Sequence, residues 1–225
     1  MARILHIETA TPVCSVSIAA SGITQAVLTT SSGNDHMSVI TGNILAVCEQ
    51  AGIGLKDIDA VAVSSGPGSY TGLRIGASTA KGICHALNKP LIAVPTLLAM
   101  VSGIQEKYQE EALLFCPLMD ARRMEVYTLV ADRDCNISAP ARAYVIEEPY
   151  FDFIPAGRKT VFFGSGVEKT LNFLPEGSIS DLHYFPSAEH LHLLALRQFN
   201  RQIFADTAYF EPEYGKEFYT PAKKQ

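Results

Sequence analysis

The sequence predicts an α/β fold built from two successive units, and three observations support this prediction. Strand-like runs at 3–8, 13–19 and 23–29 follow one another with only short turn signals between them, which is typical of an antiparallel meander. Helical and strand-like patterns then alternate, giving the order βββαβαβ in the first half of the chain. The same order partly restarts in the second half.

Local signals set the bounds of the elements in the first unit. The helix expected at 36–51 has Asn34 or Asp35 as its N-cap and Gly52 as its stop. The later elements are a buried strand at 59–63, a helix at 73–87, a strand at 91–94 and a helix that begins near Pro95.

The second unit is expected to contain strands at 113–119, 124–130, 142–146 and 160–163. Its last helical pattern spans 187–204, with Ser187 as the cap and Glu189 close to the capping-box position. We therefore divide the chain into a domain at 1–102, a smaller domain at 103–205, and a tail from about 206 to 225 that packs back on the first domain.

Composition excludes several classes of protein. The chain has 225 residues, of which 48% are hydrophobic, so it can bury one large core or two modest ones. It contains no apolar run of the ~18 residues that span a bilayer and no secretory signal sequence, so we expect a cytoplasmic protein with no membrane partner. The five cysteines are scattered and show no CxxC spacing, which indicates core residues rather than a disulfide framework or a zinc site.

The charge balance bears on the partners that the chain can bind. Its net charge is −5, its pI is near 5.7, and it has no cluster of Lys and Arg beyond Lys223 and Lys224. The chain is therefore not expected to bind nucleic acid by itself. A role with RNA would require a basic partner.

A glycine-punctuated turn, SSGPGSYTGLRIG at 64–76, joins an expected strand to the following helix. Such a turn can meet a ligand, because glycine permits close backbone approach and a helix N-terminus offers unpaired N–H groups to an anion. Gly66 and Gly68 are therefore candidate contacts for a nucleotide. Glycines also let a helix lie close to a sheet, and we favour this packing interpretation over phosphate binding.

Two units with this order of strands and helices are typical of the actin-like ATPase superfamily, whose domains have a ribonuclease H-like fold. Within that superfamily the chain resembles the TsaB (YeaZ) family through four segments: IETATPVCSVSI, SSGPGSYTGLRIGASTAKG, DARRMEVYT and the PEY near the end. The resemblance is dense from Arg3 to about Met100, touches Asp120 to Thr128, and is thin from Ile137 to Asp206.

The resemblance implies a role in making threonylcarbamoyladenosine, the modified base beside the anticodon of some tRNAs. In this family, TsaB is a non-catalytic partner of TsaD, a glycoprotease-like protein of similar fold that binds a metal and transfers the threonylcarbamoyl group. TsaE supplies an ATPase activity in a larger complex. The implied partners are thus TsaD in a heterodimer, TsaE, and tRNA only through the complex.

The resemblance also bears on metal binding. TsaD-like relatives carry two metal-ligating histidines four residues apart, just after the strand that corresponds here to 91–94, whereas this chain has Thr96 and Met100. A hydroxyl and a thioether at that spacing make a poor site for hard or borderline metals. His190 and His192 are expected to diverge on their helix, and the other histidines are isolated in sequence. We predict no catalytic residue and no metal ligand.

A reduced nucleotide site is a further implication of the resemblance. Glu8 closes the first strand, where the superfamily has an acidic residue, and Thr9 and Thr11 stand in place of the usual glycine-bearing phosphate turn. Gly164 and Gly166 could be the remnant of an adenosine-binding turn. We expect no required cofactor. Weak binding of ATP or ADP and a purely structural role for the strand-end carboxylates are the two alternatives.

The first two helices carry more apolar surface than a single contact with a sheet requires. We predict that a partner binds them in a four-helix contact, which a second copy of the chain could also use. The alternative is burial within this chain, under its second domain. The predicted interface residues are Met37, Ile40, Ile44, Val47, Leu73, Arg74, Gly76, Ala77, Ala80, Ile83 and Cys84.

The sequence leaves two other functions open. One is a metal-dependent peptidase of the glycoprotease type, and the other, ranked last, is a small-molecule kinase of the same fold. It also leaves open the role of Asp120, Arg122, Glu125 and Tyr127, which form either a structural hairpin network or a contact for a third component.

Overall fold

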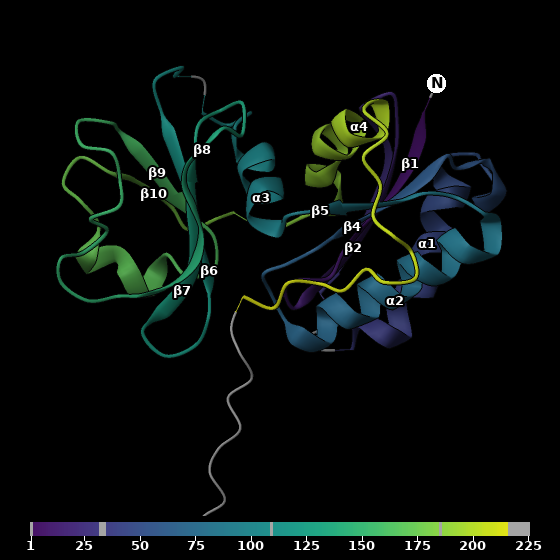
Figure 1. The fold of residues 1–225 in the computed structure, drawn as a ribbon, viewed down its shortest axis with the longest axis horizontal. Coiled ribbons are helices and arrows are strands. Elements are labelled where there is room, and N and C mark those ends of the chain that lie inside the picture. The colour runs from purple at the N-terminus through teal and green to yellow at the C-terminus, as the bar shows by residue number, and fades with distance from the viewer. Residues whose placement is uncertain (1, 32–34, 109, 185, 216–225) are drawn as a thin grey trace, which may run out of the picture.

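Two five-stranded α/β units make up the structure, a computed structural model that describes residues 2–31, 35–108, 110–184 and 186–215 (Figure 1). The first unit contains β1 (Arg3–Glu8), β2 (Val13–Ala20), β3 (Ile23–Ser31), α1 (His36–Gln50), β4 (Ala60–Ser64), α2 (Tyr70–Leu87), β5 (Leu91–Val94) and α3 (Thr96–Ile104). The later elements are β6 (Leu114–Asp120), β7 (Glu125–Ala131), β8 (Ile137–Val145), β9 (Thr160–Phe163), β10 (Ile179–Asp181) and α4 (His192–Asn200). Short 3-10 helices lie at Leu55–Asp57, Glu168–Phe173 and Ala188–Leu191.

Both sheets have the same topology. The first sheet has the order β3-β2-β1-β4-β5, in which β1, β2 and β3 are antiparallel and β1, β4 and β5 are parallel. The second has the order β10-β9-β6-β7-β8, in which β6, β7 and β8 are antiparallel and β6 and β9 are parallel. The predicted α/β order, with a meander opening each unit, is confirmed.

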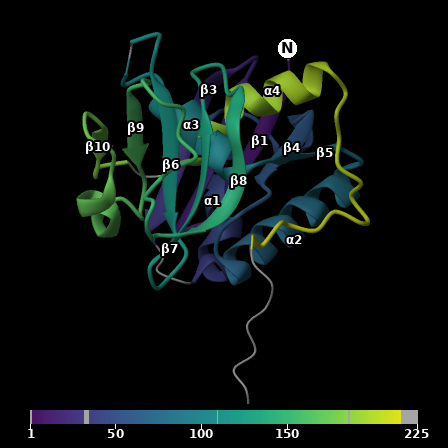
Figure 2. The same cartoon turned by 60° about the vertical axis from the view of Figure 1, so that its left-hand side comes forward.

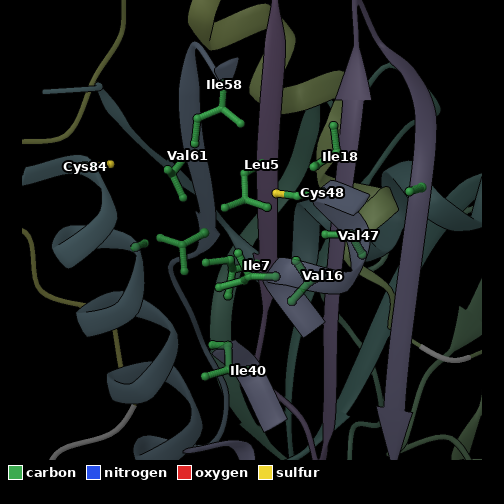
Figure 3. Close-up of a cluster of buried hydrophobic side chains, with 14 of the residues drawn as sticks. Leu5, Ile7, Val16, Ile18, Ile40, Val47, Cys48, Ile58, Val61 and Cys84 are labelled. Atoms are coloured by element: carbon green, nitrogen blue, oxygen red, sulfur yellow. The ribbon is translucent and has the colours of Figure 1, made fainter. Parts of the chain in front are cut away.

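Alternation along β1 decides which helices cover each face of the first sheet. Leu5 and Ile7 point to one face and are buried with side chains of α1 and α2, including Val47 and Cys84 (Figure 3). Ile4 points to the other face, where Leu191 and the helix α4 cover it. Helices therefore cover both faces of this sheet.

Helix α3 packs between the two sheets (Figures 1 and 2). Its Leu97 and Met100 join the core of the second sheet, whereas Ala99 contributes to the core under α4. All five cysteines are free thiols, and four of them are buried, as expected for core residues.

The predicted helix at 187–204 differs from the structure in length and in packing. A 3-10 turn at Ala188–Leu191 precedes α4, which ends at Asn200, and Gln202 then turns the chain with a left-handed φ of 55°. Leu191 and Ala195 are buried against the first sheet. The predicted second domain at 103–205 therefore includes a helix, α4, that packs on the first sheet and not on the second.

Two element boundaries also differ from the predictions. Helix α2 begins at Tyr70, three residues before the predicted start, because the Ser69 Oγ caps it by accepting the Gly72 N–H at 3.2 Å. Strand β8 spans Ile137–Val145 rather than 142–146, and as an edge strand it tolerates Pro140. The predicted cap Asn34 lies outside the described residues, and Asp35 makes no side-chain capping bond.

After α4 the chain runs back along α2 as an irregular segment at 205–215, which includes a turn at 207–209 and which we call the C-terminal strap (Figure 1). The Lys81 ammonium on α2 donates to the Ala208 and Phe210 carbonyls at 3.0 and 3.1 Å. Farther along, Glu213 N–H donates to Ser65 O at 2.8 Å. The described part of the predicted tail therefore packs on the first unit.

Gly66 is the point at which the strap and the glycine-punctuated turn come closest. Its φ is +105°, and a Cβ built on it would clash with the Glu213 carbonyl. We expect Gly66→Ala to lower the free energy of unfolding by roughly 2–4 kcal/mol, measured by urea denaturation, because the methyl group must displace the strap or the turn.

The matched control is Gly82→Ala on α2. A Cβ at Gly82 meets nothing within 4 Å, so this variant should be neutral or more stable by about 0.5–1 kcal/mol. Equal stability of the two variants would show that the strap does not constrain Gly66.

Candidate functional site

The candidate site lies at the carboxyl end of β1, where Glu8 is buried with 1% exposure. Its Oε1 accepts the Ala10 N–H at 2.6 Å and the Ser64 hydroxyl at 3.2 Å. Burial raises the pKa of Glu8 to about 7, although both hydrogen bonds favour the ionised form. Glu8 is thus a carboxyl group whose charge changes near neutral pH.

Thr9 and Thr11 follow Glu8 in the turn to β2 and face inward. Thr9 is fully buried, and in the described part of the chain its Oγ1 has no hydrogen-bond partner. That hydroxyl instead lies against Gly76 of α2, where a Cβ would clash with it. The Thr11 carbonyl accepts a hydrogen bond from His36 Nε2 at 2.9 Å.

The glycine-punctuated turn packs directly on this β1–β2 turn. A Cβ at Gly68 would lie too close to the backbone of Ala10, whose carbonyl accepts the Ser69 N–H at 2.7 Å. The Gly66 peptide is held from α3, since Gly66 N–H donates to Thr96 Oγ1 at 3.1 Å and Thr96 N–H donates to Gly66 O at 2.9 Å. The backbone segments that approach Gly66 and Gly68 closely therefore belong to this chain itself.

Gly164 and Gly166 occupy the equivalent place in the second unit, after β9. Gly166 N–H donates to Leu118 O at 2.7 Å. A Cβ at Gly164, where φ is +106°, would lie 2.8 Å from that same carbonyl and 2.8 Å from the terminal methyl of Met100. The structure thus brings Glu8, Thr9, Thr11, Gly66 and Gly68 together, but α3 separates them from Gly164 and Gly166.

Two histidines, His6 and His192, lie near each other behind this site, and the sequence did not indicate that they would meet. His6, two residues before Glu8 on β1, is fully buried; its Nδ1 lies 3.3 Å from Ser17 Oγ, and among the described residues its Nε2 has no partner. Burial and the nearby His192 lower the pKa of His6 to about 3. Only the alternation of β1 could have indicated that His6 shares a face with Glu8.

The described ranges contain no group of three or more His, Cys, Asp or Glu side chains that could hold a metal ion. Thr96 and Met100, the residues at the positions of the family's ligating histidines, are both buried. The Thr96 hydroxyl accepts a hydrogen bond from Gly66 N–H, and the Met100 side chain fills the space beside Gly164. These donors do not fit a metal.

The predicted partner residues divide into two groups. Most of them face this chain's own core and are buried, namely Ile40, Ile44, Val47, Leu73, Gly76, Ala77, Ala80 and Cys84. Other parts of the chain cover these eight residues, so they do not lie on a surface that is open to a partner. Met37 is 73% exposed, Arg74 is exposed and Ile83 is partly exposed.

Comparisons with known proteins agree on one family. A family model described as TsaD, tRNA N6-adenosine threonylcarbamoyltransferase, matches residues 9–153, which is more than half of the 225 residues. The protein named tRNA threonylcarbamoyladenosine biosynthesis protein TsaB from Escherichia coli (strain K12) is 37% identical over 134 residues, which cover 60% of this chain and 57% of that protein. The protein of the same name from Haemophilus influenzae is 33% identical over 124 residues, covering 55% and 51%.

A solved structure is also similar, described as an uncharacterized protein from Pseudomonas aeruginosa with similarity to peptidase YEAZ. It is 23% identical, with a TM-score of 0.86 over 96% of this chain and all of that one. The chain belongs to the TsaD-related family, in its TsaB (YeaZ) group. It spans little more than half the length of the two TsaB relatives, 57% and 51%.

The predicted fold of this TsaB-group chain, two ribonuclease H-like domains, is confirmed by the similar structure and by the repeated sheet topology. Across the described ranges, no helix is both long enough and apolar enough to cross a bilayer.

We expect Glu8→Gln to change how the stability of this TsaB-group chain depends on pH. The pKa of Glu8 is near 7 when folded and 4.5 in its ordinary state. Between these values the unfolded chain ionises first, so the wild type loses stability as pH rises. Relative to wild type, the glutamine variant should gain about 3 kcal/mol between about pH 4 and pH 8, measured by urea unfolding.

His6 has the opposite dependence on pH. Its lowered pKa contributes stability that is complete above the ordinary value of 6.5 and is lost as pH falls toward 3. Both proteins contain His6, so its contribution cancels when the two curves are subtracted. A difference that stays constant with pH would contradict the raised pKa of Glu8.

Proposed function

We propose that this chain is a non-catalytic partner that holds a TsaD protein in its working form during threonylcarbamoyl modification of the tRNA adenosine beside the anticodon. Family membership and the names of the two TsaB relatives support this role. In the proposed assembly TsaE joins the pair, tRNA is reached through the complex, and this chain requires no cofactor, although its β1 turn could bind ATP or ADP weakly.

The observation that carries the proposal is that Thr96 and Met100 make packing and hydrogen-bond contacts within the chain. The resemblance places the two metal-ligating histidines of TsaD at these positions. Here the Thr96 hydroxyl accepts a hydrogen bond from Gly66 N–H at 3.1 Å, and the Met100 methyl packs beside Gly164. Both side chains therefore stabilise the junction of the two units, which suits a scaffold better than a metal-dependent transferase.

We further propose that TsaD binds the exposed side of α1 and α2. Met37 and Leu45 lie two turns apart on α1 with exposures of 73% and 60%, and Thr41 between them is exposed. Gly42 on α1 and Gly82 on α2 have open space around them, so another helix backbone can approach closely. We call Met37, Thr41, Gly42, Leu45 and Gly82 the α1–α2 surface; a second copy could use it when TsaD is absent.

Charged substitutions on this surface test the interface. We expect the Met37→Asp, Leu45→Asp double variant to bind TsaD from the same organism at least about 30-fold more weakly, because each carboxylate would have to be buried without a partner. Both side chains are exposed in the free chain, so thermal unfolding should stay close to that of the wild type. Association is measured by isothermal titration calorimetry.

The matched control is Ile23→Asp, which changes an apolar residue that is 65% exposed on β3. It should bind TsaD like the wild type. In the same samples, modification of tRNA should require both proteins and fall with the loss of association. If the double variant binds TsaD as well as the wild type does, TsaD does not bind the α1–α2 surface. If the wild-type chain does not stimulate tRNA modification, the proposed function is wrong.

A further inference from the structure

The turn between β6 and β7 has an unusual backbone for its sequence. Arg122 and Arg123 both adopt left-handed conformations, with φ of 64° and 48°. Residues with long side chains rarely adopt this conformation, which favours Gly and Asn. Two successive arginines at such positions therefore break a local rule, and outliers of this kind cluster at functional sites.

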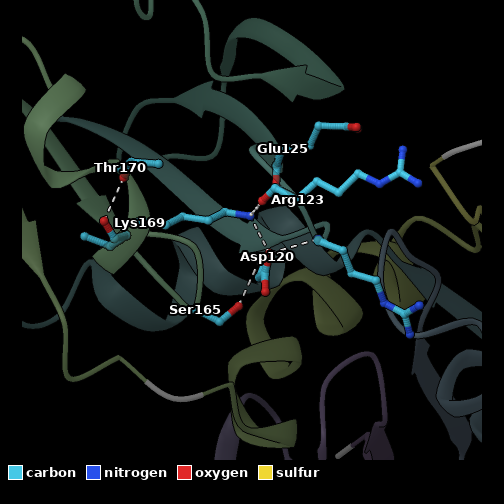
Figure 4. Close-up of polar contacts among 8 residues, drawn as sticks. Asp120, Arg123, Glu125, Ser165, Lys169 and Thr170 are labelled. Carbon is cyan, nitrogen blue, oxygen red and sulfur yellow. Dashed lines mark hydrogen bonds and ion pairs between the residues drawn. The ribbon is translucent and has the colours of Figure 1, made fainter.

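A single lysine holds this turn in place. The Lys169 ammonium donates to Asp120 Oδ1 at 2.5 Å, to Arg123 O at 2.8 Å and to Glu125 O at 2.6 Å, so all three of its hydrogens are used (Figure 4). Asp120 Oδ1 also accepts the Arg122 N–H at 2.9 Å. The unfavourable turn is thus stabilised by a side chain that sequence reasoning did not single out.

The turn held by Lys169 carries two arginines, and we call its residues 120–125 the tip. Both arginines are exposed, and the Arg123 side chain extends away from Lys169 (Figure 4). The charge of Asp120 is matched by its ion pair with Lys169. Residues 120–125 and Lys169 together contain three basic and two acidic side chains, a net charge of +1, on a chain whose net charge is −5.

The tip is also linked to helix α2. Two residues into β7, the Tyr127 hydroxyl donates to Tyr214 O of the strap at 3.2 Å. The Tyr214 hydroxyl accepts a hydrogen bond from Arg74 Nε of α2 at 3.3 Å. The tip is therefore anchored to the same helix that contributes to the α1–α2 surface.

We propose that Arg122 and Arg123 contact the phosphate backbone of RNA when this chain is in its complex, an inference that rests on the proposed function. Guanidinium groups match phosphate geometry and keep their charge at all relevant pH values. The tip is a short turn, with no helix or strand that could enter a groove and contact base edges. Such a turn suits phosphate contacts, which position RNA without reading its sequence. A polyanionic ligand also gives a reason for arginines at positions where Gly or Asn would be less strained.

The deciding variant is Arg122→Asn, Arg123→Gly, because it removes both charges while it suits the left-handed backbone. Its melting temperature should rise by about 2–4 °C. In complex with TsaD it should bind tRNA about tenfold more weakly at moderate salt, and the slope of log affinity against log salt should fall by about 1.5. Fluorescence anisotropy with labelled tRNA over a salt series measures both quantities.

Two controls accompany it. Arg122→Lys, Arg123→Lys keeps the charges and should keep the salt slope. Lys56→Gln, Arg201→Gln removes two exposed charges elsewhere and should bind tRNA like the wild type. A more stable Asn-Gly variant with unchanged tRNA affinity and slope would overturn the contact with RNA.

Loss of TsaD association in the Asn-Gly variant would also overturn it, because the tip would then bind an acidic protein surface. The proposed function fails separately. If wild-type chain and TsaD form no complex, or if their complex binds no tRNA, both proposals fall. If the wild-type complex binds tRNA and the Asn-Gly variant binds it equally, only the arginine contact is wrong.

Discussion

The hydrogen bonding of the peptide at Gly66 is the constraint on which the rest of the structure depends. Three segments that are far apart in sequence meet there: the glycine-punctuated turn itself, the start of α3 through Thr96, and the C-terminal strap through Glu213. Because the strap carbonyl occupies the place of a Cβ, only glycine fits, and the packing interpretation of this turn accounts for the contacts of Gly66. The strap then continues to Tyr214, whose carbonyl accepts a hydrogen bond from the Tyr127 hydroxyl on β7. The strap therefore contacts both units.

Most of the fold follows from local patterns, because β1, β2, β5 and α1 are largely apolar segments that end at recognisable turn or stop residues. The sequence could not show which unit α4 covers, since its apolar stripe fits either sheet. The same limit applies to the predicted interface: the stripe through Ile44 and the exposed residue Leu45 are both apolar, and only the position of the sheet separates them. Lys169 escaped notice because its three acceptors lie more than 40 residues away along the chain.

The candidate site shows a similar division. Sequence reasoning identified Glu8, Thr9, Thr11, Gly66 and Gly68, and the structure places all five together at the end of β1 and the turn that packs on it. It could not establish that α3 would fill the space between this cluster and Gly164. That outcome depends on the size and direction of the Met100 side chain, and no local pattern records how a side chain packs against a distant glycine.

Burial at the end of β1 also affects which ligands this site can hold. Burial moves the pKa values of Glu8 and His6 in opposite directions, to about 7 and about 3, so both side chains are neutral through most of the interval between those values. A neutral carboxyl group is a poor ligand, because metal binding must first displace its proton. Glu8 and Thr96 are also both engaged in contacts within the chain, Glu8 with Ala10 and Ser64 and Thr96 with Gly66.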